Sequence, residues 1–250
     1  MEQIVAVDLV GNSKIDSDPE TMRSRAVWYR LIAGAFIEEP SKEYIEALRN
    51  LDCIDMLSEH GVSFDDDFLA SDACELNEDL ACEYTSLFAS SGGFPPIESV
   101  RMEGGYQQQS MSDVKGDYRS EGFVVGKGKF HLFDDQLGVE LEFLASLIER
   151  QADAIEKNDA DEAKRLNRSI RRFWVKHPGR WVRGFGELIA EASEHSFYRE
   201  MAVLLKVFAD AELLLLGINM DDDDGGHYRL PKKDFMSQQE GAAGMTCGGG

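Results

Sequence analysis

Residues 133–150, FDDQLGVELEFLASLIER, decide the fold class of this chain. Apolar residues in this stretch recur after four, three and four positions: Leu137, Leu141, Leu144 and Ile148. This spacing places them on one face of an α-helix. Asp134 and Asp135 precede the run, and acidic side chains are favoured at the positive end of a helix. The stretch therefore predicts a long helix that buries one face.

The same helical period recurs along most of the chain. Helices are expected over residues 19–39, 42–51, 52–60, 65–90, 106–118, 134–150, 159–175, 178–189 and 197–215. Asp18 suits an N-cap, and Pro19 suits the first helical position. The one run that alternates weakly like a strand, residues 122–130, has no partner strand. The sequence therefore predicts an all-α protein, a single globular bundle of about seven to nine helices.

The two ends of the chain lack apolar periodicity. Residues 1–18 are expected to form a flexible N-terminal arm and residues 19–218 the helical domain. Residues 219–250 are polar and glycine-rich, and are expected to form a disordered acidic tail.

Composition limits the class of partner. The 250 residues include 26 Lys and Arg against 47 Asp and Glu, a net charge of −21. Such a surface repels phosphate backbones, so nucleic-acid binding is not expected, whereas a cationic partner is favoured. The four cysteines form no C-x-x-C pair, which fits a reduced cytoplasmic protein. No secretory signal is recognisable, and no apolar run of about 18 residues predicts a membrane span.

Motifs for catalysis or metal binding are not found. The nearest match to a di-iron Glu-x-x-His pair, EASEH at 191–195, has its histidine at the wrong offset. The acidic run at 221–224 begins an EF-hand pattern, but Lys232 stands where the twelfth-position glutamate is required. We therefore expect no catalytic residue, no metal site and no cofactor, and a protein that is not an enzyme.

Residues 80–100, LACEYTSLFASSGGFPPIESV, combine an aromatic helix end with an abrupt stop. Tyr84, Leu87 and Phe88 share one face of the expected helix. Pro95 and Pro96 then force an extended, rigid exit, which would hold the following Glu-Ser pair in a fixed place. An ordinary reading is an aromatic core patch with a helix stop; the alternative is a binding groove.

The order of these segments resembles the TorD/DmsD-like redox-enzyme maturation chaperones, relatives of the nitrate reductase delta subunit. The resemblance rests on a Y-x-x-L-F helix end, a Pro-Pro-x-Glu-Ser turn, a tyrosine-bearing helix and an Asp-Asp-x-Leu-x-x-Glu-Leu-x-Phe helix, in that order. EHSFYREMAVLLKVF at 194–208 also looks like the last long helix of that family. Together these segments extend the resemblance over roughly residues 20–216.

The resemblance implies an all-helical cytoplasmic chaperone. Such proteins bind the twin-arginine signal peptide, and often the body, of an immature molybdopterin oxidoreductase catalytic subunit. They hold it until its cofactor is inserted, and so delay export. A homodimer is compatible with the resemblance. The implied peptide-binding residues are Tyr84, Leu87, Phe88, Pro95, Pro96, Glu98, Ser99, Asp134, Asp135 and Gln136. The family commonly has histidine where this chain has Gln136.

Two other functions remain open at this level. Glu98, Asp134 and Asp135 could form the carboxylate cluster of a helical hydrolase, although no nucleophile–base pair accompanies them. The chain could also be a structural or regulatory helical subunit that never meets a signal peptide.

Overall fold

The computed structural model describes residues 18–126 and 132–223. Within these ranges every regular element is helical, which confirms the all-α prediction. The elements are α1 (Pro19–Phe36), α2 (Lys42–Leu48), α3 (Leu51–Glu59), α4 (Asp66–Leu69), α5 (Ala73–Tyr84), the π-helical turn η2 (Thr85–Ala89), α6 (Glu98–Glu103), α7 (Gln109–Ser120), α8 (Leu137–Glu156), α9 (Ala160–Lys176), the 3-10 turn η3 (Pro178–Arg180), α10 (Val182–Ala192) and α11 (Ser196–Leu215).

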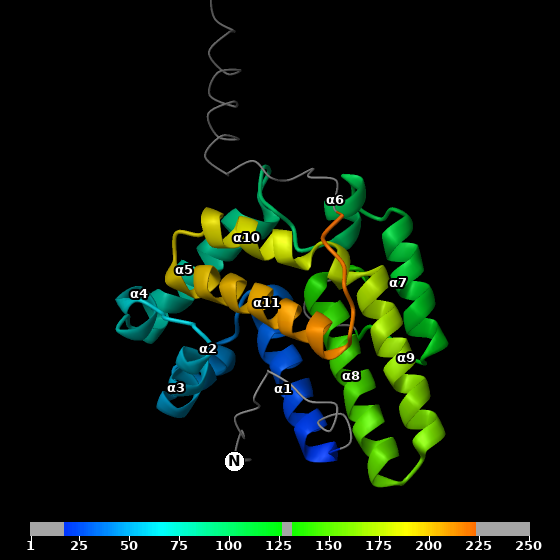
Figure 1. Ribbon diagram of the computed structural model, residues 1–250. Coiled ribbons are helices and arrows are strands. Elements are labelled where there is room, and N and C mark those ends of the chain that lie inside the picture. Colours follow the sequence, from blue (N-terminus) through cyan, green and yellow to red (C-terminus); the bar gives the residue numbers. More distant parts are fainter. Residues whose placement is uncertain (1–17, 127–131, 224–250) are drawn as a thin grey trace, which may run out of the picture.

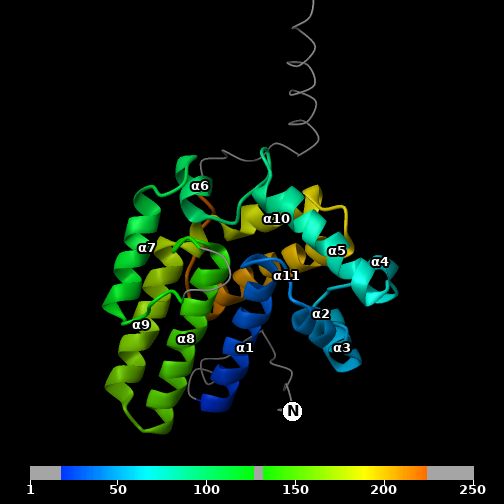
Figure 2. The ribbon, with the colours of Figure 1, turned by 180° about the vertical axis from the view of Figure 1, so that it is seen from behind.

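Helix α8 lies between α1 and α9, and α7 flanks α9 on the outside (Figure 1). Helices α10 and α11 pack on each other across one end of this row, and α2, α3 and α4 lie to one side. The view from behind shows the same order (Figure 2). The fold-deciding residues Leu137, Leu141, Leu144 and Ile148 are all fully buried, as their spacing predicts.

One local prediction needs correction, and one short helix was not predicted. The single helix expected over residues 65–90 is wrong, because the chain leaves α4 at Leu69 and starts again at Ala73. Asp72 drives the restart, since its side chain accepts a hydrogen bond from the backbone N–H of Cys74 at 2.8 Å. The short helix α6 was not expected. The cap at Asp18 is as predicted, with its carboxylate accepting from Thr21 N at 2.9 Å.

The segment after α11 packs against the bundle as far as the structure describes it. Met220 packs on the core. Asp222 lies 2.8 Å from Arg183, and Asp223 lies 3.0 Å from Arg180. The first residues of the expected tail are thus attached to η3 and the start of α10. The rest of that tail, from residue 224, and residues 1–17 of the expected arm lie outside the described residues.

None of the helices in the described part of the chain combines the length and apolar character needed to cross a membrane.

Candidate functional site

A groove of about 480 Å³ opens between the end of α1, the α5–η2 junction, the segment at Pro95 and Pro96 (the Pro-Pro segment) and the start of α8. Its lining is largely apolar and aromatic. The residues that form it are Ile37, Glu38, Glu39, Tyr84, Thr85, Phe88, Ala89, Pro95, Pro96, Ile97, Tyr106, Leu132, Phe133 and Gln136. We call this feature the Pro-Pro groove. A mostly apolar concavity with few polar groups is the usual form of a binding site.

The aromatic wall of the groove comes from the end of α5. The helix widens into the π-helical turn η2, in which Ser90 N donates to Thr85 O, five residues earlier, at 2.8 Å. Such turns add one residue to a helical turn and often occur at functional sites. Tyr84 and Phe88 line the groove with ring centroids 5.0 Å apart. Leu87 is fully buried and supports this wall from the core side.

The two glycines allow the chain to turn sharply after η2. Gly92 has φ +84°, a left-handed conformation that favours glycine. A Cβ on Gly93 would lie 2.7 Å from the carbonyl oxygen of Leu87. This close approach lets Phe94 N donate to the same carbonyl. The turn thereby directs Pro95 and Pro96 back along the groove.

The Pro-Pro segment is joined to the start of α8 by backbone hydrogen bonds. Ile97 and Gln136 form an isolated antiparallel bridge. Leu137 N donates to Pro96 O at 2.8 Å, and Glu98 N donates to Asp135 O at 2.9 Å. Segments that lie about 40 residues apart in sequence therefore form one wall.

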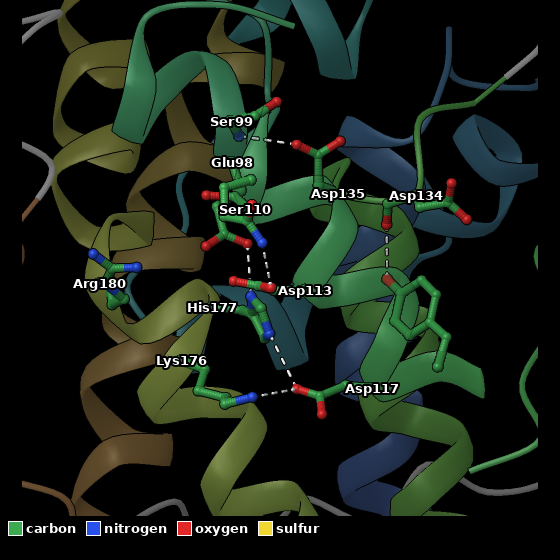
Figure 3. Close-up of polar contacts among 12 residues, drawn as sticks. Glu98, Ser99, Ser110, Asp113, Asp117, Asp134, Asp135, Lys176, His177 and Arg180 are labelled. Atoms are coloured by element: carbon green, nitrogen blue, oxygen red, sulfur yellow. Dashed lines mark hydrogen bonds and ion pairs between the residues drawn. The ribbon is translucent and has the colours of Figure 1, made fainter. Parts of the chain in front are cut away.

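Beneath this wall lies a cluster of buried acidic side chains (Figure 3). Glu98, Asp135 and Glu140 are each 0% exposed. Asp135 Oδ2 accepts from Ser99 N at 2.9 Å. His177 lies between Glu98 and Asp117, with Nδ1 2.8 Å from Glu98 Oε2 and Nε2 3.2 Å from Asp117 Oδ2. The cluster connects α6, α7, α8 and the end of α9.

Burial sets the direction of the pKa shift for two of these carboxyl groups, Glu140 and Asp135. The pKa of Glu140 is raised well above its ordinary value by burial and by the nearby charges of Glu98 and Asp135. Burial also raises the pKa of Asp135, although the hydrogen bonds from Ser99 oppose that shift. Neither oxygen of Glu140 has a hydrogen-bond partner among the described residues. Protonation gives Glu140 a hydroxyl that can donate to a neighbouring carboxylate.

The structure divides the expected site residues into two groups. Those that line the Pro-Pro groove are Tyr84, Phe88, Pro95, Pro96 and Gln136. Those that do not line it are Leu87, Glu98, Ser99, Asp134 and Asp135. Of the second group all are buried except Asp134, whose side chain is 22% exposed and lies 3.2 Å from Lys115 Nζ. The carboxylates in the groove are instead those of Glu38 and Glu39.

Sequence reasoning did not identify Glu38, Glu39, Glu140 or His177. Glu140 could have been identified from the sequence. It falls between Leu137 and Leu144 on the apolar face of its helix, where burying a charge is unfavourable. The two glutamates precede Pro40 and looked like an ordinary helix end. His177 precedes Pro178 after α9, and nothing in its local sequence indicates its partners.

Over residues 18–126 and 132–223, no group of three or more histidine, cysteine or acidic side chains is arranged to hold a metal ion. Although the cluster around Glu98 is rich in carboxylates, its described geometry offers hydrogen bonds rather than a coordination shell.

Comparison with known protein families gives a match. The family model described as nitrate reductase delta subunit matches residues 42–187, more than half of the chain. The matched range contains η2, the Pro-Pro segment, the start of α8 and His177, but begins after Glu38 and Glu39. No curated protein and no solved structure shows significant similarity to the chain.

Proposed function

The chain belongs to the nitrate reductase delta subunit family, a TorD-like family of redox-enzyme maturation chaperones, and on that premise we propose how it recognises its client. It acts in the cytoplasm, where it binds the twin-arginine signal peptide and the immature body of a molybdopterin oxidoreductase catalytic subunit. Bound in this way, the client stays available for cofactor insertion before export. The protein itself carries out no chemistry.

The Pro-Pro groove is the observation that carries this proposal. A twin-arginine leader is a cationic end followed by an apolar run. The apolar run needs a concave apolar surface, and the groove offers Tyr84, Phe88, Pro95 and Pro96 within about 480 Å³. The net charge of −21 favours encounter with a cationic peptide.

The burial of the acidic cluster weighs against a hydrolase. A carboxylate that acts on a substrate must reach it. Glu98 and Asp135 are 0% exposed and do not line the groove. They are better suited to fixing the groove wall than to meeting a substrate.

The proposal is tested by filling the groove. Ala89 lines the groove and is exposed, so Ala89→Trp should occupy the space without disturbing the core. We expect the affinity for a synthetic twin-arginine leader, measured by calorimetry, to fall about tenfold or more. The melting temperature should stay near that of the parent.

The matched control is Glu78→Trp, which adds the same ring to an exposed position of α5 outside the groove. It should bind the leader as the parent does. A parent protein that binds no leader, or an Ala89→Trp variant that binds at parental affinity, would contradict the proposal and favour a structural subunit.

A further inference from the structure

Glu38 and Glu39 are the charged residues among those that line the groove in the described part of the chain. They stand at one edge, directly after α1, while largely apolar and aromatic residues form the remainder. Their charge acts inside the groove: burial first, and then the charges of Glu38 and Glu39, raise the pKa of Tyr84 to about 12. The groove therefore has an acidic edge and an apolar floor.

Gln136 adds a neutral acceptor next to this edge. Its Nε2 donates to Phe36 O at 2.8 Å and to Ile37 O at 2.6 Å. Both amide hydrogens are thus used, and Oε1 is left buried with no hydrogen-bond partner among the described residues. Gln136 is only 5% exposed and lines the groove. A buried acceptor without a hydrogen-bond donor costs free energy, and a donor from a bound ligand would remove that cost.

The acidic edge is held in place before any ligand arrives. The two bonds from Gln136 fix the backbone directly before Glu38. Gly138 lets the same segment approach α8 closely, since a Cβ there would lie 2.5 Å from Ile37 Cβ. A preorganised site loses less conformational entropy on binding.

We propose that Glu38, Glu39 and Gln136 Oε1 together receive the arginine pair of the leader, and that this contact sets the direction in which the leader binds. The inference rests on the proposed function and identifies the part of the groove that reads the two arginines. The cationic end lies at the end of α1, and the apolar run crosses Phe88 toward Pro95 and Pro96.

Guanidinium groups suit these acceptors. Each carries five N–H donors and no acceptor, and the acidic edge with Gln136 Oε1 supplies acceptors. Apolar surroundings lower the local dielectric constant and strengthen the attraction. Glu98 and Asp135, which the resemblance implied as peptide-binding residues, are fully buried and do not line the groove.

The test removes charge from both partners. The protein variant is Glu38→Gln/Glu39→Gln, and the second peptide is the leader with both arginines replaced by glutamine. We expect the parent leader to bind the variant about tenfold or more weakly, the scale of one lost charged hydrogen bond. The glutamine leader should bind the parent protein weakly, and its affinity for the variant should be only a little lower.

Asp52→Asn/Asp55→Asn is the matched control. It removes two charges from exposed residues of α3 that do not line the groove. This control separates the direct contact from the general effect of net charge, and it should bind the parent leader within about twofold of the parent protein.

Each outcome is decisive. If Glu38→Gln/Glu39→Gln binds the parent leader at parental affinity, the inference is overturned while the proposed function stands. If the variant weakens both leaders equally, the glutamates do not read the arginines and the inference is again overturned. If neither leader binds the parent protein, the proposed function fails and the inference fails with it.

Discussion

His177 shows how one residue links three helices. Its side chain is 3% exposed and lies between Glu98 of α6 and Asp117 of α7. Burial alone would lower the pKa of His177, but the hydrogen bonds to Asp117 and Glu98 outweigh burial and raise it. In turn, burial would raise the pKa of Asp117, but His177 and Lys176 lower it. The charged pair is therefore favoured in the folded state.

The raised pKa predicts a stability that falls with rising pH. A group whose folded-state pKa is raised stabilises fully below its ordinary pKa, about 6.5 for histidine, and loses that contribution as pH rises through the folded-state value. Asp135 and Glu140, whose pKa values are also raised, act in the same direction. We expect the free energy of unfolding, measured in urea, to fall as the pH rises above about 6.5.

His177→Gln should reduce the pH dependence of the free energy of unfolding. It should also lower that free energy by about 1–3 kcal/mol at pH 6, because buried Glu98 loses its charged donor. His60→Gln, at a ring that packs on Trp28 and outside this cluster, is the comparison variant. An unchanged pH dependence in His177→Gln would show that the histidine does not titrate with folding.

At the scale of elements, the α5–η2 junction and the turn after it form one unit. The π-helical turn brings the Leu87 carbonyl toward the chain leaving Gly93, and Phe94 N closes the turn on that carbonyl. The direction of the Pro-Pro segment, and so the shape of the groove, depends on this close backbone contact.

Gly93→Ala should therefore destabilise the fold. The added Cβ would lie 2.7 Å from Leu87 O and 3.1 Å from Ser90 O, both backbone atoms that cannot move aside cheaply. We expect a loss of about 1–3 kcal/mol in urea denaturation, as for other overpacked sites, together with weaker leader binding.

Gly116→Ala is the matched control. Gly116 lies inside α7 with nothing within 4 Å of an added Cβ. Alanine is the better helix former, so this variant should gain about 0.5–1 kcal/mol. Equal effects at the two glycines would mean that the contact with Leu87 O is not what requires Gly93.

At the scale of the whole molecule, one buried network joins helices far apart in sequence. Glu212 of α11 is 0% exposed and accepts from Arg25 Nε of α1 at 2.8 Å. Tyr29 also donates to Glu212, and Trp174 Nε1 of α9 donates to the Tyr29 hydroxyl at 2.8 Å. A network of this kind fixes the relative positions of α1, α9 and α11.

Glu212→Gln should be among the most destabilising single changes. It removes the carboxylate charge that pairs with the Arg25 guanidinium, on a side chain only 6% exposed. Breaking a buried pair in this way costs about 3–5 kcal/mol. Glu187→Gln, which removes the carboxylate of an exposed pair with Lys206, should change stability by less than about 1 kcal/mol. Similar losses from the two variants, measured by chemical denaturation, would contradict this assignment.

The sequence by itself determined the fold class and most helix positions. Apolar spacing is a local property, and the 3.6-residue period of Leu137, Leu141 and Leu144 follows from backbone geometry alone. Capping at Asp18 and the turn at Gly92 are equally local, because each depends on residues within a few positions. For the same reason the aromatic and proline wall of the groove could be predicted from one short stretch.

Only the tertiary structure decided which acids face the groove. Glu98, Asp135 and Glu38 look alike in sequence, as carboxylates next to helix ends. Whether each is buried depends on partners far along the chain: Glu98 meets His177, 79 residues away, and Gln136 fixes the backbone at Ile37, 99 residues away. Burial and pairing arise from long-range packing, which the local spacing of residues does not encode.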